Sequence, residues 1–226
     1  HTLLRLDARG QDRSQQLLAY AVNYAAETNE RNGVLFAVKG IFGGYAGRYA
    51  VNPYYDKVKE YARIENRDLW SYELNLDAKE IKRLLLHLWE LKGADQPYLF
   101  FTRNCSYELL VMLAVARPQL QLTDGFDFYA IPADTLRALT TRPDLVTDVS
   151  YRPSRRTELV NAYRQLPGPA RSVARAVARG RLDPQAPAVE KLPPRLRARA
   201  LQVAYVLEQY RFVAGKLPRK KAAPRA

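Results

Sequence analysis

A short apolar and aromatic run passes through a tight polar turn directly into a helical pattern, and this junction constrains the fold most strongly. Tyr98 to Phe101 is typical of a strand, Asn104 suits an N-cap, and helically spaced apolar residues follow up to the breaker Pro118. Cys105, the only cysteine, therefore falls in the first helical turn. The positive end of the helix and the nearby Arg103 both favour a thiolate there, so the junction predicts a nucleophilic thiol.

Length and composition predict a globular chain. Its 226 residues, of which 47% are hydrophobic, can bury one substantial core with a smaller appended piece. No apolar run reaches the length of about 18 residues that indicates a membrane-spanning helix, and the start at His1 suggests a processed or trimmed fragment. One Cys and two His exclude a disulfide framework and a Cys-rich zinc site, and we expect no metal and no cofactor.

The positive charge of the chain is concentrated near its C-terminal end. Residues 151–226 carry 18 Lys and Arg against 4 Asp and Glu, a formal charge of +14. The other 18 basic and 19 acidic residues leave about −1 for residues 1–150. The two parts are therefore expected to meet different partners.

The local patterns predict a mixed, α+β chain of two domains. For the first domain, residues 1–150, we expect a hairpin of strands at 1–7 and 17–24, a glycine-rich loop at 39–47, helices at 54–66, 77–92 and 132–139, and strands at 69–76, 126–131 and 145–150. For the second domain, residues 151–226, we expect Arg- and Ala-rich helices at 157–165, 170–179 and 195–214 and a basic tail at 218–226.

A nucleophilic thiol needs a base, and the sequence offers His1 and His87. His87 lies beside the buried face of its predicted helix, which indicates a packing or surface role. His1 begins a predicted strand and could project toward the N-terminus of a helix. The residues alone do not join His1 to Cys105.

A resemblance joins the two residues. Five segments in order resemble the Lnb N-terminal periplasmic domain family of bacterial envelope proteins: residues 1–5, 21–24, 39–45, 67–72 and Asn104-Cys105-Ser106-Tyr107. The resemblance covers about residues 1–165, and the family is similar to circularly permuted papain-like domains of the NlpC and lecithin:retinol acyltransferase kind. It implies Cys105 as the nucleophile, His1 as the base and Asn23, on the next strand, as the third polar residue of the site.

The same resemblance implies N-acylation of lipoproteins with a phospholipid as acyl donor, through a thioester on Cys105. The Cys105 N–H, with Asn104 or a tyrosine as a second donor, would stabilise the oxyanion. We expect the glycine-rich loop to form a substrate-binding or lipid-facing wall through Lys39, Gly43, Gly44 and Tyr45. A loop packed on the core is the alternative interpretation.

The basic helix at 170–179 presents a row of arginines, since Arg171, Arg175 and Arg179 recur every four residues. This row fits an anionic membrane surface. Nucleic acid is not expected as a partner, because few aromatic residues accompany the basic ones.

The sequence thus predicts a permuted papain-like domain with a basic helical extension, acting as a membrane-associated thiol acyltransferase in the periplasm. Two alternatives stay open: a cell-wall peptidase or amidase with the same Cys105 and His1 pair, and a membrane-docking domain without enzymatic activity.

Overall fold

The computed structural model describes residues 1–28, 30 and 32–213. The chain divides into two units, each held together mainly by its own internal contacts. The first unit contains His1–Val58 and Trp70–Ser150, and the second contains Lys59–Leu69 and the chain from Tyr151 onward. The segment Lys59–Leu69 thus belongs with the basic helices, although the sequence division places it in the first domain.

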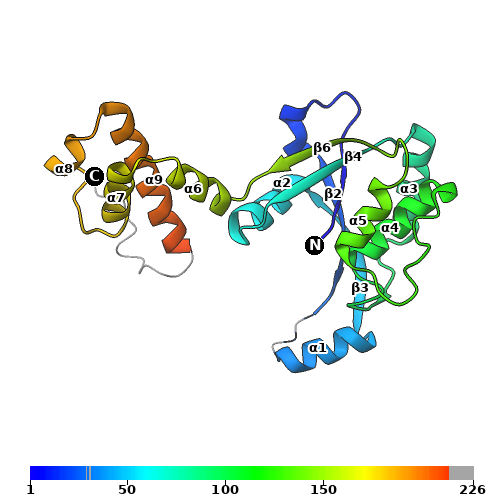
Figure 1. The fold of residues 1–226 in the computed structure, drawn as a ribbon. Coiled ribbons are helices and arrows are strands. Elements are labelled where there is room, and N and C mark those ends of the chain that lie inside the picture. The colour runs from blue at the N-terminus through cyan, green and yellow to red at the C-terminus, as the bar shows by residue number, and fades with distance from the viewer. Residues whose placement is uncertain (29, 31, 214–226) are drawn as a thin grey trace. The chain divides into compact units, whose positions relative to one another are not determined.

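The first unit is built on a four-stranded antiparallel sheet with the order β1-β2-β3-β5 (Figure 1). The strands are β1 (Leu4–Leu6), β2 (Tyr20–Ala26), β3 (Tyr45–Pro53) and β5 (Gln96–Tyr98). β1 and β2 pair as the predicted hairpin does, but its second strand starts later than expected. Residues 17 and 18 belong instead to a short 3₁₀ helix, η1 (Arg13–Leu18). This helix starts at Arg13 because Asp12 caps its N-terminus by accepting from the Ser14 and Gln15 N–H groups.

The predicted glycine-rich loop at 39–47 is wrong. The helix α1 (Gly33–Phe42) occupies its first half and β3 its last three residues. Gly43 ends the helix in the left-handed conformation, at φ 79°. Gly40 serves close packing inside the helix, because a Cβ there would lie 2.2 Å from the ring of Phe100. These glycines therefore indicate a helix terminus and a tight contact, which the sequence pattern alone does not distinguish from a loop.

Helices cover both faces of this sheet. The central helix α4 (Cys105–Ala116) packs on β2 and on α3 (Ala78–Glu90), with α5 (Pro132–Thr140) beside it, while α2 (Tyr54–Val58) lies against the other face (Figure 1). The core between α3, α4 and the sheet is formed by large aliphatic side chains: Leu84, Leu110, Met112, Leu113, Leu122 and Leu145. The α+β class expected from the sequence is confirmed.

The predicted strand at 126–131 is also wrong. This segment is irregular, and it is fixed to the turn before α4 through the Ala130 N–H, which donates to the Phe101 carbonyl at 2.6 Å. Asn104 donates to the Ala130 carbonyl at 2.7 Å. The segment with alternating apolar residues is therefore hydrogen-bonded to the turn before α4 and does not pair in a sheet.

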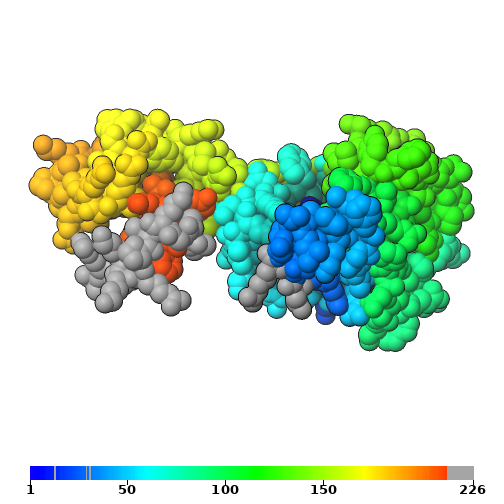
Figure 2. All heavy atoms as spheres, turned by 90° about the horizontal axis from the view of Figure 1, so that it is seen from below, coloured from blue at the N-terminus to red at the C-terminus, as the bar shows by residue number. Residues whose placement is uncertain are grey.

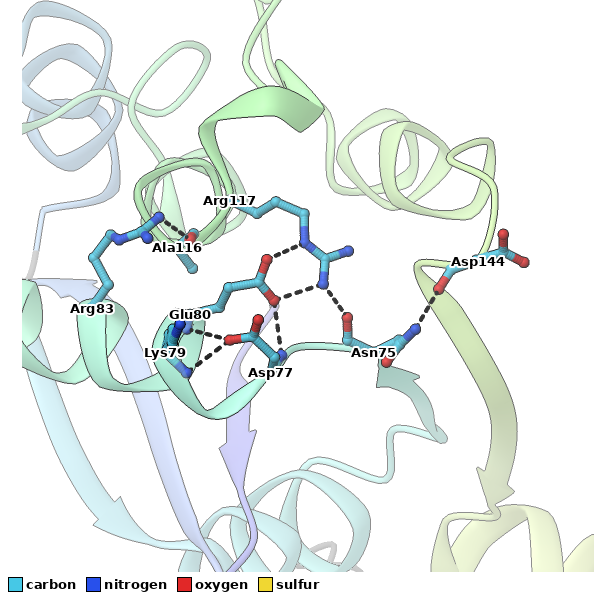
Figure 3. A network of polar contacts seen from close by, with 8 residues as sticks. All are labelled: Asn75, Asp77, Lys79, Glu80, Arg83, Ala116, Arg117 and Asp144. Carbon is cyan, nitrogen blue, oxygen red and sulfur yellow. Dashed lines mark hydrogen bonds and ion pairs between the residues drawn. The ribbon is translucent and has the colours of Figure 1, made fainter.

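A polar network ties α3, α4 and the second, two-stranded sheet together (Figure 3). That sheet consists of β4 (Leu69–Leu74) and β6 (Val146–Arg152). Asp77 and Glu80 form the predicted capping box of α3, and Glu80 also accepts from the Arg117 guanidinium at 2.6 Å. This bond lowers the pKa of Glu80 to about 2, and Arg117 donates in addition to the Asn75 carbonyl. The network lies at the C-terminal end of α4, the end of the core opposite to Cys105.

The second unit is helical. It contains the π-helical turn η2 (Lys59–Ile64) and the helices α6 (Arg155–Arg164), α7 (Gly168–Ala178), α8 (Pro187–Glu190) and α9 (Pro194–Val213). Its core is formed mainly by small side chains of α7 and α9: Ala170, Ala174, Ala178, Ala200, Val203 and Ala204. The predicted tail at 218–226 lies outside the described residues. Among the described helices, none combines the length and the apolar character that a bilayer span requires.

Candidate active site

The thiol of Cys105 lies at the start of α4, as predicted, and its residue is 8% exposed. Asn104 is the N-cap, and its side-chain oxygen accepts from the Ser106 and Tyr107 N–H groups at 3.1 and 3.2 Å. The Cys105 side chain is therefore held at the positive end of a buried helix, nearly withdrawn from water.

The structure brings His1 to Cys105. Burial raises the pKa of the Cys105 thiol, but hydrogen bonds from the His1 side chain and the Thr2 N–H, the charge of His1 and a hydrogen bond from Tyr98 act in the opposite direction. The pKa is lowered overall. A histidine that precedes β1 is thus paired with a cysteine in the first turn of α4, as a thiol nucleophile needs.

Tyr98 is a member of this site that the sequence analysis did not single out. It is the last residue of β5, and its hydroxyl interacts with both the backbone N–H and the side chain of Cys105. Burial first, and then the neighbouring Cys105 thiolate, raise the pKa of Tyr98 to about 12, so that it keeps its proton at neutral pH. The hydroxyl accepts from the Cys105 N–H and donates to the Cys105 sulfur, so Tyr98 is in direct contact with the predicted nucleophile.

Asn104, one of the two expected oxyanion donors, has a different role. Its side-chain amide donates to the Phe100 carbonyl at 3.0 Å and to the Ala130 carbonyl at 2.7 Å. Both amide hydrogens are thus committed, while its oxygen caps α4. Asn104 fixes the turn that presents Cys105, and a tyrosine as second donor stays a prediction, for which Tyr98 is the tyrosine in contact with Cys105.

Asn23 does not join the site. Along β2 the side chains alternate, and Tyr24, whose ring stacks on Tyr98 at 5.5 Å, points to the face that α4 covers. Asn23 therefore points to the opposite face, where it accepts from the Asn52 side chain at 2.8 Å. His87 is not placed as the base either, since its Nδ1 lies 3.3 Å from Glu90 on the surface of α3.

A buried carboxyl lies one helical turn beyond the thiol. Glu108 is 4% exposed and accepts from the Tyr49 hydroxyl at 3.2 Å. Burial raises its pKa, whereas the Tyr49 hydrogen bond and the charge of Arg103 lower it, and the result is a raised pKa. Tyr24 lies between Tyr49 and Tyr98, with ring centroids at 4.9 and 5.5 Å. Three tyrosines from three strands thus form a row of rings from Tyr98, which contacts Cys105, to Tyr49, which bonds to Glu108.

The expected substrate wall lies at the junction of α1 and β3. Lys39 donates to Glu30 at 3.1 Å and lies 6.0 Å above the ring of Tyr45. Tyr45 is buried and is the register partner of Tyr98, while Gly43 and Gly44 form the connection. Tyr45 thus lies beside Tyr98 in the sheet, and the other three residues lie on the segment that leads into β3. The contact of all four with substrate stays a prediction.

The arginine row of the second unit is only partly available. Arg171 donates to the Leu166 carbonyl at 3.0 Å and lies 5.8 Å from the ring of Tyr163. Arg175 lies 5.5 Å from the same ring but is exposed, as is Arg179. The role of the row at a membrane surface stays a prediction, and Arg171 contributes to the fold of α7 instead.

Two family models match the chain. One, described as the Lnb N-terminal periplasmic domain, matches residues 1–142, and the other, a domain of unknown function (DUF7842), matches residues 149–226. Neither a curated protein nor a solved structure matches. In the described part of the chain no three His, Cys, Asp or Glu side chains are grouped to hold a metal ion.

Proposed function

The chain belongs to the Lnb N-terminal periplasmic domain family, which makes it a periplasmic protein of the cell envelope, and from this premise we propose that it is a thiol-dependent acyltransferase. The proposed donor is a phospholipid and the proposed acceptor is the N-terminal amine of a lipoprotein. The observation that carries the proposal is the lowered pKa of Cys105 in contact with His1 at the start of α4.

In the first half-reaction His1 takes the proton of the Cys105 thiol, and the thiolate sulfur attacks the carbonyl carbon of a lipid ester. The carbonyl oxygen becomes an oxyanion, which the Cys105 N–H and the Tyr98 hydroxyl stabilise. When the intermediate collapses, the ester C–O bond breaks and the lysolipid oxygen takes the proton from His1. The acyl chain then remains on Cys105 as a thioester.

In the second half-reaction the amine nitrogen of the acceptor attacks the thioester carbonyl. The same two donors hold the second oxyanion, and His1 accepts a proton from the nitrogen. The C–S bond breaks, an amide is released, and the thiolate of Cys105 is protonated from His1. Low exposure of Cys105 favours this order of events, because it limits the access of water to the thioester.

The proposal is tested by intact mass measurement after incubation with vesicles of a diacyl phospholipid. We expect an added mass of one acyl chain that hydroxylamine removes, and its loss on addition of a lipoprotein-type N-terminal peptide. The Cys105→Ala variant should show no adduct and an unchanged fold, because alanine is a small helix former. An adduct that forms only with peptidoglycan peptides would instead identify a cell-wall amidase, and no adduct at all would refute the proposal.

A further inference from the structure

Nine of the exposed large apolar side chains of the first unit lie on three segments, which we name the apolar rim. Most are bulky and largely uncovered, with Phe42 80% and Phe128 86% exposed. The rim consists of the exposed residues of α1, of the turn before α4 and of the irregular segment that follows it in the fold: Val34, Leu35, Val38, Ile41 and Phe42; Phe101; and Phe128, Tyr129 and Ile131.

The helix α1 is the largest part of the rim. Only Gly40 of its ten residues is buried, although nine of the ten are apolar or glycine. Figure 2 looks onto this side of the first unit, with α1 in blue at the front. A helix that is apolar nearly all round is normally enclosed by protein or lipid, so its exposure indicates a surface that meets an apolar partner.

Hydrogen bonds join the three segments of the rim to each other and to Asn104, the residue before Cys105. The Phe100 N–H donates to the Gly40 carbonyl at 2.9 Å, which ties α1 to the turn before α4. The Ala130 N–H donates to the Phe101 carbonyl at 2.6 Å, which ties the last segment to the same turn. Asn104, the neighbour of Cys105, donates to Ala130. The rim therefore borders the start of α4.

The charges among these segments suit a phospholipid surface. Arg103 is an exposed cation, Lys39 is a second cation whose charge is paired with Glu30 at 3.1 Å, and Asp127 is the one acidic residue in segments 33–44, 97–106 and 126–132. Exposed aromatic rings with flanking cations are typical of surfaces that enter the boundary between headgroups and acyl chains. A partner protein with an acidic surface would pair with these cations as well as lipid headgroups do. Such a partner would not supply an ester to the thiol.

We propose that the apolar rim inserts into the boundary between headgroups and acyl chains of a phospholipid bilayer and so brings Cys105 to the depth of the lipid esters. The choice of a lipid ester rests on the proposed function. An interfacial helix reaches about 5–10 Å into the boundary of headgroups and chains, which is where the ester carbonyls of a phospholipid lie. Lipid would then reach the buried thiol without leaving the membrane.

Flotation with zwitterionic phosphatidylcholine vesicles tests this proposal, in the Cys105→Ala background so that no covalent adduct contributes. We expect Phe42→Ser with Phe128→Ser to reduce partitioning about 30-fold, since two large apolar side chains no longer leave water. The matched control is Leu18→Ser with Leu86→Ser, which removes two exposed side chains, at 72% and 55%, outside the rim. The control should partition as the parent does.

A second measurement reports on depth. In the Cys105→Ala background, bimane attached at Val38→Cys should shift to shorter wavelength when vesicles are added, and bimane at Leu86→Cys should not. Equal partitioning of rim and control variants, or no shift at residue 38, would overturn the proposal. So would a dimer in solution that only the rim variants abolish, because the rim would then be covered by a second copy. If the chain with Cys105 intact binds the same vesicles but forms no thioester, the proposed function is refuted and the rim is still supported.

Discussion

The two units of this protein differ in architecture and in the kind of core: the first combines a sheet with helices, and the second is helical. The first unit fills its core with leucines and a methionine and also buries Asn104, Ser106 and Glu108 on the first turn of α4. The second unit packs α7 on α9 through alanines, which allow close approach of the two helices and leave no space for a polar group between them. The buried polar groups of the described chain thus concentrate where a reaction can use them.

Charge follows the same division. The Lys and Arg residues of the second unit lie around a small apolar interface, whereas the first unit is nearly neutral and places single charges such as Arg103 beside its site. We infer that the first unit carries the chemistry and the second contributes through its surface potential. Changes beside Cys105 in the first unit should therefore alter rates, and changes in the basic residues of the second should alter binding to anionic surfaces without altering the chemistry.

The largest expected effect is that of His1→Ala. Without its proton acceptor, thioester formation should fall roughly 10²- to 10⁴-fold. The pH midpoint of iodoacetamide labelling of Cys105 should move to higher pH, because the hydrogen bond and charge of His1 lower that pKa. His87→Ala is the matched control and should change neither rate, since its ring pairs with Glu90. Equal labelling rates of the two variants at neutral pH would exclude His1 as the base.

Tyr98→Phe should have the next largest effect. Loss of one oxyanion donor costs roughly 10²- to 10³-fold in rate, while the ring and its stacking on Tyr24 are kept. Tyr24→Phe is the control, because its buried hydroxyl has no hydrogen-bond partner among the described residues. Similar single-turnover rates for Tyr98→Phe and the parent would remove Tyr98 from the site.

Local features were predictable from the sequence. The caps Asp77 and Asn104 and the position of Cys105 at a helix start are correct, because each depends on residues within one helical turn. The link between His1 and Cys105 came only from the family resemblance, since it depends on how a strand end meets a helix from a distant part of the chain.

Long-range features were not predictable. Gly40 indicated a loop because the ring that occupies the space of its missing Cβ, Phe100, lies sixty residues away in the chain. Asn23 was placed in the site because alternation along β2 gives two faces without telling which one α4 covers. Tyr98 stacks on Tyr24, and Tyr49 bonds to Glu108, through the register of three strands, which no single segment encodes. A carboxyl in a largely apolar helical pattern is the signal that could have singled out Glu108.

In the second unit, Arg175→Gln with Arg179→Gln should weaken binding to anionic vesicles about 30-fold at low salt, since each basic side chain contributes about 1 kcal/mol near such a surface. The change in thioester formation should be small when substrate is presented in detergent. Arg171→Gln should instead lower the unfolding temperature, because Arg171 bonds to the Leu166 carbonyl. Unchanged binding of the double variant to anionic vesicles would show that the row is not a membrane contact.

The smallest expected effect is a difference in pH dependence between the units. In the second unit, hydrogen bonds from the Ser154 N–H and the Thr157 hydroxyl lower the pKa of Asp68 to about 2. Its contribution to stability is complete above its ordinary pKa near 3.8 and is lost as the pH falls toward 2. In the first unit, burial raises the pKa of Glu108, so its contribution is complete below its ordinary pKa and is lost as the pH rises through the raised value.

Hydrogen exchange of backbone amides can follow the two units separately in one chain. Between pH 5 and pH 3, protection of α6 should fall and that of α4 should hold or rise, after correction for the intrinsic exchange rate. Asp68→Asn should flatten the response of α6, because a neutral amide does not titrate. Glu108→Gln should flatten that of α4 while keeping an acceptor for the Tyr49 hydroxyl. Responses of the same sign in both helices would mean that one common group dominates, and the electrostatic contrast between the two units would then be incorrect.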